Sequence, residues 1–301
     1  TSSGSVTGVV EWERDARGRI AREKVDGASN LAFEYDDDDL VISFGPVKLG
    51  RESESGFINT VQAAGTYEQI ERTLSENGAT VSYGEPTHWR TSSEGKAVYD
   101  LQLFRDVLGR ITDRTEELEG KKRVFSYGYD AAGRLSSVTT DGVKTATYTY
   151  DANGNRLTED GTTGLGVYDE QDRVTSYGGA VFTHDAHGDR LSKTEGGTTT
   201  TYEHDALGAL RKVKVGVVEI AYAVDALGRR VARTENGTVT HRWLYRNALQ
   251  PVAEYDGGGK LRWRFVYATG WHVPNAAIDA SGVTHKIITD QVGSLRAVGR
   301  G

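Results

Sequence analysis

One short motif recurs along most of this chain: a Tyr-Asp pair, a short turn that contains glycine, and then arginine followed by an aliphatic residue. Residues 129–135 read YDAAGRL and residues 150–157 read YDANGNRL. Between Asp106 and Asp225 successive copies begin 24, 21, 18, 16, 20 and 20 residues apart. A repeat of this length marks one supersecondary unit that is stacked many times. The sequence therefore predicts an array, and the function is expected to belong to the array as a whole. Looser copies begin at Asp15, Asp106, Asp169, Asp185, Asp205, Asp225, Asp256, Asp279 and Asp290.

Each copy is predicted to be a β-hairpin. Residues 122–129 alternate aromatic with small or polar side chains, the period of two that is typical of a strand. Asp130 can then begin an Asx turn, and Gly133 stands where a type I turn passes into the left-handed conformation that glycine adopts most readily. The pair Asp141-Gly142 is a strong signal for the next hairpin turn, and Asn77-Gly78, Asp160-Gly161, Gly196-Gly197 and Asn236-Gly237 are the same signal in other copies. Each unit is thus two strands of about 6 to 9 residues.

Stacked units of this kind give an all-β fold, a long antiparallel meandering sheet of hairpins. Such a sheet twists and has open edges, so we expect it to coil into part or all of a hollow shell or barrel. A helix over residues 67–74 is the only helical alternative of note, and a strand suits that segment equally. The residues predicted to build the repeat turns are Asp106, Gly109, Tyr129, Asp130, Gly133, Tyr150, Asp151, Gly154, Asp169, Asp185, Gly188, Asp205, Gly208, Asp225, Gly228, Asp290 and Gly293.

The composition excludes several classes of protein. A formal net charge of −7, with acidic and basic residues interleaved, argues against a nucleic-acid binder. Zero cysteine removes disulfides, thiolate catalysis and cysteine-ligated zinc. Zero methionine, even at the first position, indicates an excised or processed piece of a longer polypeptide. No apolar run approaches the length of about 18 residues that a membrane span needs.

These motifs resemble the RHS/YD-repeat family, which includes bacterial Rhs proteins, the C components of Tc toxins and animal teneurins. The two full copies carry the resemblance, together with residues 99–111, residues 168–174, and the segment DQVGSLR at residues 290–296, which is similar to the family's closing segment. The similarity covers at least residues 99–298, and weaker copies extend it to about residue 15. We therefore expect residues 1–301 to be a single shell segment of a larger chain.

The resemblance implies a non-catalytic shell that encapsulates, shields or displays an attached toxin-like or effector domain. Members usually continue into an Asp-Pro-containing self-cleaving motif, which this chain lacks. The catalytic aspartates of that self-cleaving motif therefore cannot be assigned to residues of this chain, and we expect neither enzymatic activity nor a cofactor. The expected partners are the rest of the parent chain, a cleaved fragment or an encapsulated effector, and the expected location is secreted or at the cell surface, in a bacterium. The alternative is a teneurin-like adhesion module that binds a cell-surface protein or a glycan.

Some constellations suggest chemistry but have simpler readings. His184, Asp185 and His187 could ligate a metal in a hydrolase, yet His184 and His204 occupy the slot held by Tyr129 in its own copy. The run of aspartates at residues 36–39 could bind calcium, and it also fits one more acidic turn. Asp279 and Asp290 both stand at repeat-turn positions rather than forming an acid-base pair. The aromatic residues of the tail are expected to line a buried sheet face, with sugar stacking as the alternative: Trp243, Tyr245, Trp263, Phe265, Tyr267 and Trp271.

We also expect the isolated segment to be incomplete as a shell, because stacked hairpins leave an unpaired strand at each end. Its edges should then pair with the parent chain, with a cleaved fragment or with another copy. A stable monomer with both edges exposed, observed by sedimentation, would contradict this expectation.

Overall fold

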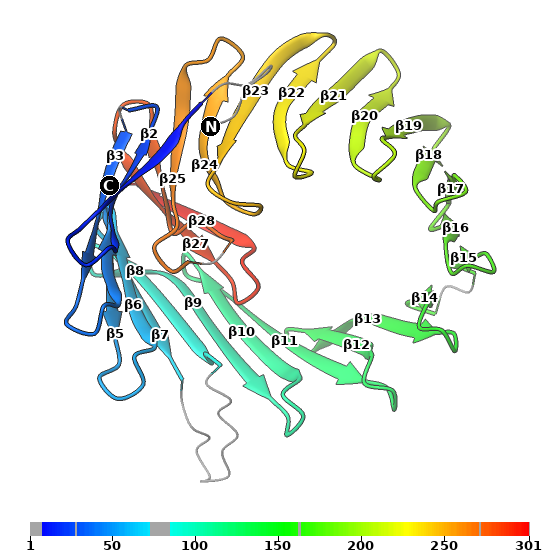
Figure 1. Cartoon of the computed structure of the whole chain (residues 1–301). Helices are drawn as coiled ribbons and strands as arrows, with labels where there is room; N and C mark the ends of the chain where they lie inside the picture. Colours follow the sequence, from blue (N-terminus) through cyan, green and yellow to red (C-terminus); the bar gives the residue numbers. More distant parts are fainter. Residues whose placement is uncertain (1–7, 28, 73–84, 162–163, 271, 301) are drawn as a thin grey trace. The chain divides into compact units, whose positions relative to one another are not determined.

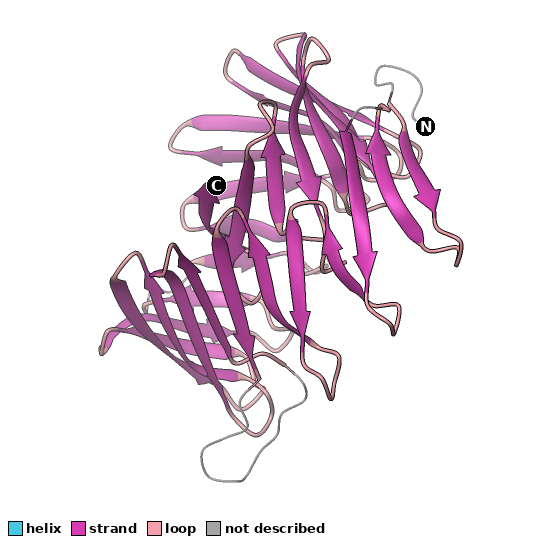
Figure 2. Ribbon diagram, turned by 90° about the vertical axis from the view of Figure 1, so that its left-hand side faces the viewer, coloured by secondary structure: helices cyan, strands magenta, loops and turns pink. Residues whose placement is uncertain are grey.

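The computed structural model describes residues 8–27, 29–72, 85–161, 164–270 and 272–300. These residues form strands joined by tight turns, and no helix occurs among them (Figure 2). In the same ranges, nothing helical is long and apolar enough to cross a membrane. The prediction of an all-β fold is confirmed.

Two antiparallel sheets hold all the strands, in each case in sequence order (Figure 1). The first sheet contains β1 (Val10–Arg14), β2 (Ile20–Val25), β3 (Ser29–Tyr35), β4 (Val41–Phe44), β5 (Val47–Arg51), β6 (Ile58–Ala63), β7 (Thr66–Glu71), β8 (His88–Ser93), β9 (Lys96–Arg105), β10 (Ile111–Leu118), β11 (Lys121–Tyr129), β12 (Leu135–Thr140), β13 (Val143–Tyr150) and β14 (Arg156–Glu159).

The second sheet begins where the first one stops. It contains β15 (Gly166–Tyr168), β16 (Val174–Tyr177), β17 (Ala180–His184), β18 (Arg190–Glu195), β19 (Thr198–His204), β20 (Leu210–Val215), β21 (Val218–Val224), β22 (Arg230–Glu235), β23 (Thr238–Tyr245), β24 (Pro251–Asp256), β25 (Leu261–Val266), β26 (Ala276–Asp279), β27 (Thr284–Thr289) and β28 (Leu295–Arg300).

The predicted long antiparallel meander is divided into two sheets. The ladder is interrupted between β14 and β15, where the backbone carbonyl of Arg156 accepts a hydrogen bond from the Tyr168 hydroxyl at 3.0 Å. Gly166 lies so close to this carbonyl that a Cβ atom would stand 2.3 Å from its oxygen. The Tyr168 hydroxyl is thus the donor to the Arg156 carbonyl at the place where the meander passes from one sheet to the next.

The strand assigned to residues 66–71 settles the ambiguous segment in favour of β structure. β7 pairs with β6 on one side and with β8 on the other. The predicted Asn77-Gly78 turn lies outside the described residues.

Two compact units divide the chain. Unit 1 comprises residues 1–123 and 242–301, and unit 2 comprises residues 124–241. Unit 1 has a hydrophobic core in which Phe44, Val47 and Val61 from the first sheet pack with Val266 and Ala276 from the second. Unit 1 therefore joins the two ends of the chain.

Unit 2 has almost no core. Among its described residues, Ala180 and Ala232 are the only hydrophobic side chains that are buried. Its strands instead have many half-buried side chains, as in β12, β16 and β21. The order of this unit must therefore come mainly from the ladder and from its turns.

The turns that join successive hairpin repeats follow the expected Asp-Gly and Asn-Gly pattern. Asp141 and Gly142 both have positive φ, of 49° and 80°, which is the geometry of a type I′ turn. The Asp141 carboxylate also accepts a hydrogen bond from the backbone amide of Val124 at 2.8 Å. Asn236 repeats this contact with the amide of Glu219 at the same distance.

Candidate functional site: the repeated aspartate turn

The turn at Asp130 shows how one hairpin repeat is built. The Asp130 amide donates to the carbonyl of Arg134, and the Gly133 amide donates back to the carbonyl of Asp130, both at 2.9 Å. One carboxylate oxygen of Asp130 accepts hydrogen bonds from the amides of Ala132 and Arg134, again at 2.9 Å. Gly133 has a φ of 80°, and the ladder carries a bulge beside Tyr129. The carboxylate thus satisfies two amides that the turn leaves without a ladder partner.

This turn geometry recurs in unit 1 and in unit 2. In each copy the aspartate Oδ1 atom accepts a hydrogen bond from the amide four residues later. The aspartates concerned are Asp15, Asp36, Asp106, Asp130, Asp151, Asp169, Asp185, Asp205, Asp225, Asp256, Asp279 and Asp290. One further turn differs, because Asn247 Oδ1 accepts hydrogen bonds from the amides two and three residues later.

An arginine four residues after the aspartate links the Asp130 turn to the next hairpin repeat. Arg134 donates from Nε to the second carboxylate oxygen of Asp130 at 2.8 Å and from Nη1 to the carbonyl of Asp151 at 2.9 Å. Its guanidinium lies 4.7 Å from the centre of the Tyr150 ring, a cation-π distance. The Tyr150 hydroxyl donates to the carbonyl of Leu135 at 2.7 Å. Arg134 therefore binds the following hairpin repeat, and Tyr150 of that repeat binds back to the strand that follows Arg134.

A second copy has the same arginine and tyrosine contacts. Arg19 donates to Asp15 at 2.7 Å and lies 4.4 Å from the Tyr35 ring, whose hydroxyl donates to the carbonyl of Ile20 at 2.8 Å. Arginine stands four residues after the aspartate in five of the twelve turns, and this recurrence in the sequence was a signal for the link.

Two adjacent copies in unit 2 lack this arginine. Asp189 and Ala209 stand four residues after Asp185 and Asp205, at the position that is arginine in five of the twelve turns. A cavity of about 710 Å³ lies beside these turns, and its lining includes His187. The sequence suggests His184, Asp185 and His187 only as an alternative metal site. Among the residues that the structure describes, no group of three His, Cys, Asp or Glu side chains could hold a metal ion.

The other candidate constellations are likewise engaged in turns and packing. Asp36 begins a turn and Asp39, with a φ of 62°, occupies its glycine position and pairs with Arg17 and Arg19. Asp279 accepts hydrogen bonds within its own turn. Trp263 packs edge-on against His285, with ring centres 5.3 Å apart, and Trp271 lies outside the described residues.

Buried charge in unit 1 is a feature that the sequence argument missed. Glu23 on β2 is fully buried and accepts hydrogen bonds from Arg264 at 2.5 Å, Arg246 at 3.3 Å and Trp12 at 3.1 Å. The pKa of the Arg264 guanidinium is lowered by burial, an effect that Glu23 partly opposes. Nothing local in the sequence marks Glu23, because its strand alternates like any half-exposed one.

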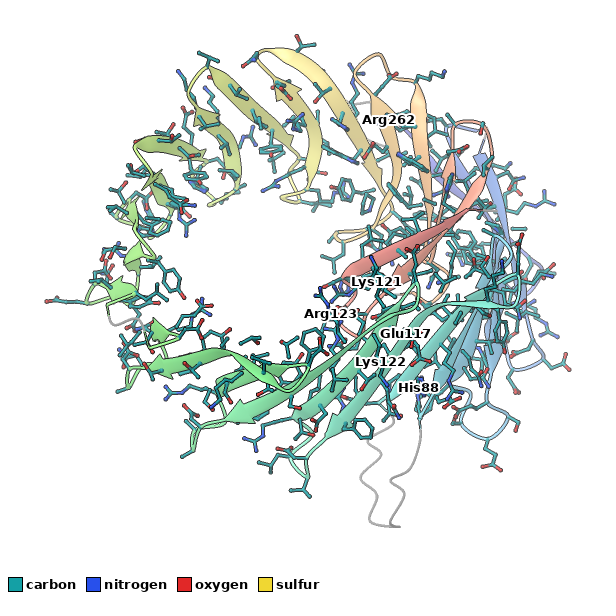
Figure 3. All side chains as sticks on the ribbon, turned by 180° about the vertical axis from the view of Figure 1, so that it is seen from behind. His88, Glu117, Lys121, Lys122, Arg123 and Arg262 are labelled. Carbon is teal, nitrogen blue, oxygen red and sulfur yellow. The ribbon has the colours of Figure 1, made fainter. Side chains whose placement is uncertain are left out.

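His88 forms a second polar cluster on the first sheet. It is labelled in Figure 3 and lies on β8, where its Nε2 atom is 2.9 Å from Asp100. Its Nδ1 atom is 3.3 Å from Arg90 and 3.6 Å from Glu71. These contacts hold three neighbouring strands together in one polar network.

Hydrogen bonds lower the pKa of several turn carboxyls below their usual value of 3.8. For Asp130 the cause is the backbone amide of Arg134 and then its guanidinium; for Asp106 it is first the Arg110 side chain. Because the folded-state pKa is the lower one, this stabilisation is complete above the unfolded-state pKa and is lost as the pH falls through the folded-state pKa. We therefore expect the free energy of unfolding, measured with urea, to decrease below a pH of about 4.

Asp130→Asn tests this pH dependence. Asparagine keeps the amide acceptor but has no charge to titrate, so we expect lower stability near neutral pH and a shallower loss in acid. An acid profile parallel to that of the parent would contradict the assignment.

Gly133→Val and Gly154→Val test the turn itself. Both glycines have positive φ, 80° and 93°, which a β-branched residue adopts only with strain. Each substitution is expected to destabilise the protein by about 1–3 kcal/mol in chemical denaturation. Gly133→Asn is the matched control, because Asp172 fills the equivalent turn position at a φ of 58°. Equal stability of the valine and asparagine variants would show that backbone strain is not the cause.

The fold and the turn define a repeat protein whose sheets are built from Tyr-Asp hairpins. A sequence model of the teneurin YD-shell family matches residues 28–299. The chain belongs to the teneurin YD-shell family, and the resemblance to RHS/YD-repeat proteins is confirmed.

Individual relatives are much longer than this chain. Human teneurin-4 is 30% identical over 163 residues, which is 52% of this chain and 6% of that protein. The double-stranded DNA deaminase toxin A of Burkholderia cenocepacia is 28% identical over 263 residues, or 77% of this chain and 18% of the toxin. A crystal structure of TcdB2-TccC3-TEV matches 97% of this chain and 18% of its own, with 12% identity and a TM-score of 0.49.

Proposed function

We propose that this chain is a segment of a shell wall that encloses, shields or displays an attached domain of the same parent polypeptide. The observation that carries the proposal is the repeated turn, in which the aspartate carboxylates hold backbone amides. Carboxylates used in this way order a sheet and are poorly placed for acid-base chemistry. In this proposal the chain is not itself catalytic and binds no cofactor.

Family membership and the size of the relatives support the proposal. The Burkholderia relative is named a toxin, and this chain corresponds to 18% of its length. In our proposal, the partner of the shell is a toxin-like or effector domain elsewhere in the parent chain, which is secreted or displayed at the surface of a bacterium.

Protease protection of the attached domain tests this function. The full-length parent and the isolated attached domain are treated with the same protease, and cleavage is followed by mass spectrometry. We expect the attached domain to survive in the parent at a protease dose that digests it alone. Equal cleavage rates in the two samples would contradict enclosure.

Adhesion through exposed aromatic residues is less well supported. The Trp263 ring packs against His285 within unit 1 and is half-buried. A glycan array with the parent chain and Trp263→Ala separates the two functions: specific binding that is lost in the variant would favour adhesion.

A further inference from the structure

Unit 1 contains an interface at which strands from residues 10–118 meet strands from residues 244–300; we call this interface the seam. Three hydrophobic clusters span it. Leu31, Phe44 and Val47 pack with Val266 in the first cluster. Val25 packs with Leu244, Val252 and Ala253 in the second, and Tyr99, Leu101 and Leu103 pack with Ile288 in the third. Figure 1 shows β2 and β3, in blue, close to β24 and β25, in orange.

Buried charges are concentrated at the seam. Apart from His88, each buried side chain of the Asp, Glu, Lys and Arg type in the described part of the chain has a charged partner on the other side of this interface: Glu23, Glu68, Arg264, Lys286 and Asp290. Lys286 Nζ lies 2.8 Å from a Glu68 carboxylate oxygen, and the two residues are 2% and 7% exposed. These ion pairs join residues that are more than 170 positions apart in sequence.

The ion pairs across the interface share one polarity. At Glu23–Arg264, Glu68–Lys286 and Glu116–Arg296 the acid comes from the first sheet and the base from the second. Asp290 binds Arg296 of its own sheet at 2.6 Å and lies 3.9 Å from Arg114 of the first sheet. A shifted alignment would leave the buried charges without their partners, which is strongly unfavourable.

We propose that the seam is a recognition interface through which the two sheets bind each other specifically, independently of the covalent connection between them. Buried ion pairs add little net stability compared with apolar residues, but they penalise wrong partners. The hydrophobic clusters supply affinity, and the positions of the buried charges select the register. Each sheet is then the specific partner of the other.

A nicked protein tests this proposal. A protease site is placed in the connection between β14 and β15, where the ladder is interrupted, so that cleavage of the folded chain yields one fragment per sheet. We expect the fragments to elute together in size-exclusion chromatography and to separate only in denaturant. Fragments that separate under native conditions would overturn the proposal.

Charge reversal at the seam tests its specificity. Glu68→Lys and Lys286→Glu each place like charges together, and we expect at least a tenfold weaker association of the nicked fragments in either variant. The double variant restores an ion pair of opposite polarity and should recover most of the association. Glu13→Lys is the control, because it breaks the half-exposed pair with Lys24 inside the first sheet.

Recovery in the double variant separates recognition from a general loss of folding. Each uncut variant is first checked by circular dichroism, and only the association of the cut fragments is compared. A double variant that associates no better than the singles, or a Glu13→Lys variant that dissociates as they do, would contradict a charge-specified seam.

Discussion

Replacing Arg264 by alanine is expected to lower the free energy of unfolding by about 3–5 kcal/mol. Arg264 is 1% exposed, and its guanidinium donates to Glu23 at 2.5 Å and to the carbonyl of Val252 at 2.8 Å. Removing it leaves the fully buried Glu23 carboxylate with less of its compensating charge. Such a carboxylate must keep a large desolvation cost or take up a proton. Urea denaturation followed by tryptophan fluorescence measures the change.

Arg262→Ala is the matched control on the same strand. Arg262, labelled in Figure 3, is 45% exposed in its side chain and pairs with Glu254 at 3.6 Å. An exposed pair of this kind contributes at most about 1 kcal/mol. The double variant Glu23→Leu with Arg264→Met should be much closer in stability to the parent than Arg264→Ala is. Equal losses for Arg264→Ala and Arg262→Ala would contradict the buried pair.

Phe44→Ala is expected to have a comparable effect, about 3–5 kcal/mol, by opening a cavity in the core of unit 1. The Phe44 ring is fully buried and stacks on Phe33 with ring centres 3.9 Å apart. The Arg246 guanidinium, which pairs with Glu23 at the seam, lies 5.9 Å from the centre of the Phe44 ring. Phe44 therefore also packs beside the charged residues of the seam. Thermal and urea denaturation are both suitable measurements.

Phe104→Ala provides the comparison, because Phe104 is 50% exposed on β9. The contact surface that it loses is much smaller, and we expect a loss below about 1.5 kcal/mol. If Phe44→Ala destabilises no more than Phe104→Ala, the assigned core of unit 1 is wrong.

The hairpins could be predicted because their signals are local. The Asp130 turn requires a carboxylate, two amides and a glycine within five residues, and all of these stand next to one another in the sequence. The Asp141-Gly142 turn is equally local. The strand direction and the all-β class follow from these turns, since short hairpins can only join antiparallel neighbours.

The seam could not be predicted because it depends on pairs that are distant in sequence. Glu68 and Lys286 each alternate with other residues on a strand, and either could face solvent. Only the packing of one sheet on the other makes them buried partners. The role of Arg134 could not be predicted for a related reason, because its partners Asp151 and Tyr150 belong to the next hairpin repeat. The close approach of Gly166 to the Arg156 carbonyl beside the break between β14 and β15 also has no sequence signature.

Residue-resolved amide hydrogen exchange tests the central claim, that the repeated aspartate orders the sheet. In the Asp130 turn, the amides of Ala132 and Arg134 donate to the Asp130 carboxylate. We predict slow exchange of both amides in the parent, faster exchange of both in Asp130→Ala, and intermediate rates in Asp130→Asn, which keeps a neutral acceptor. Exchange of these amides at the rate of an unstructured chain in the parent, unchanged in Asp130→Ala, would contradict the account.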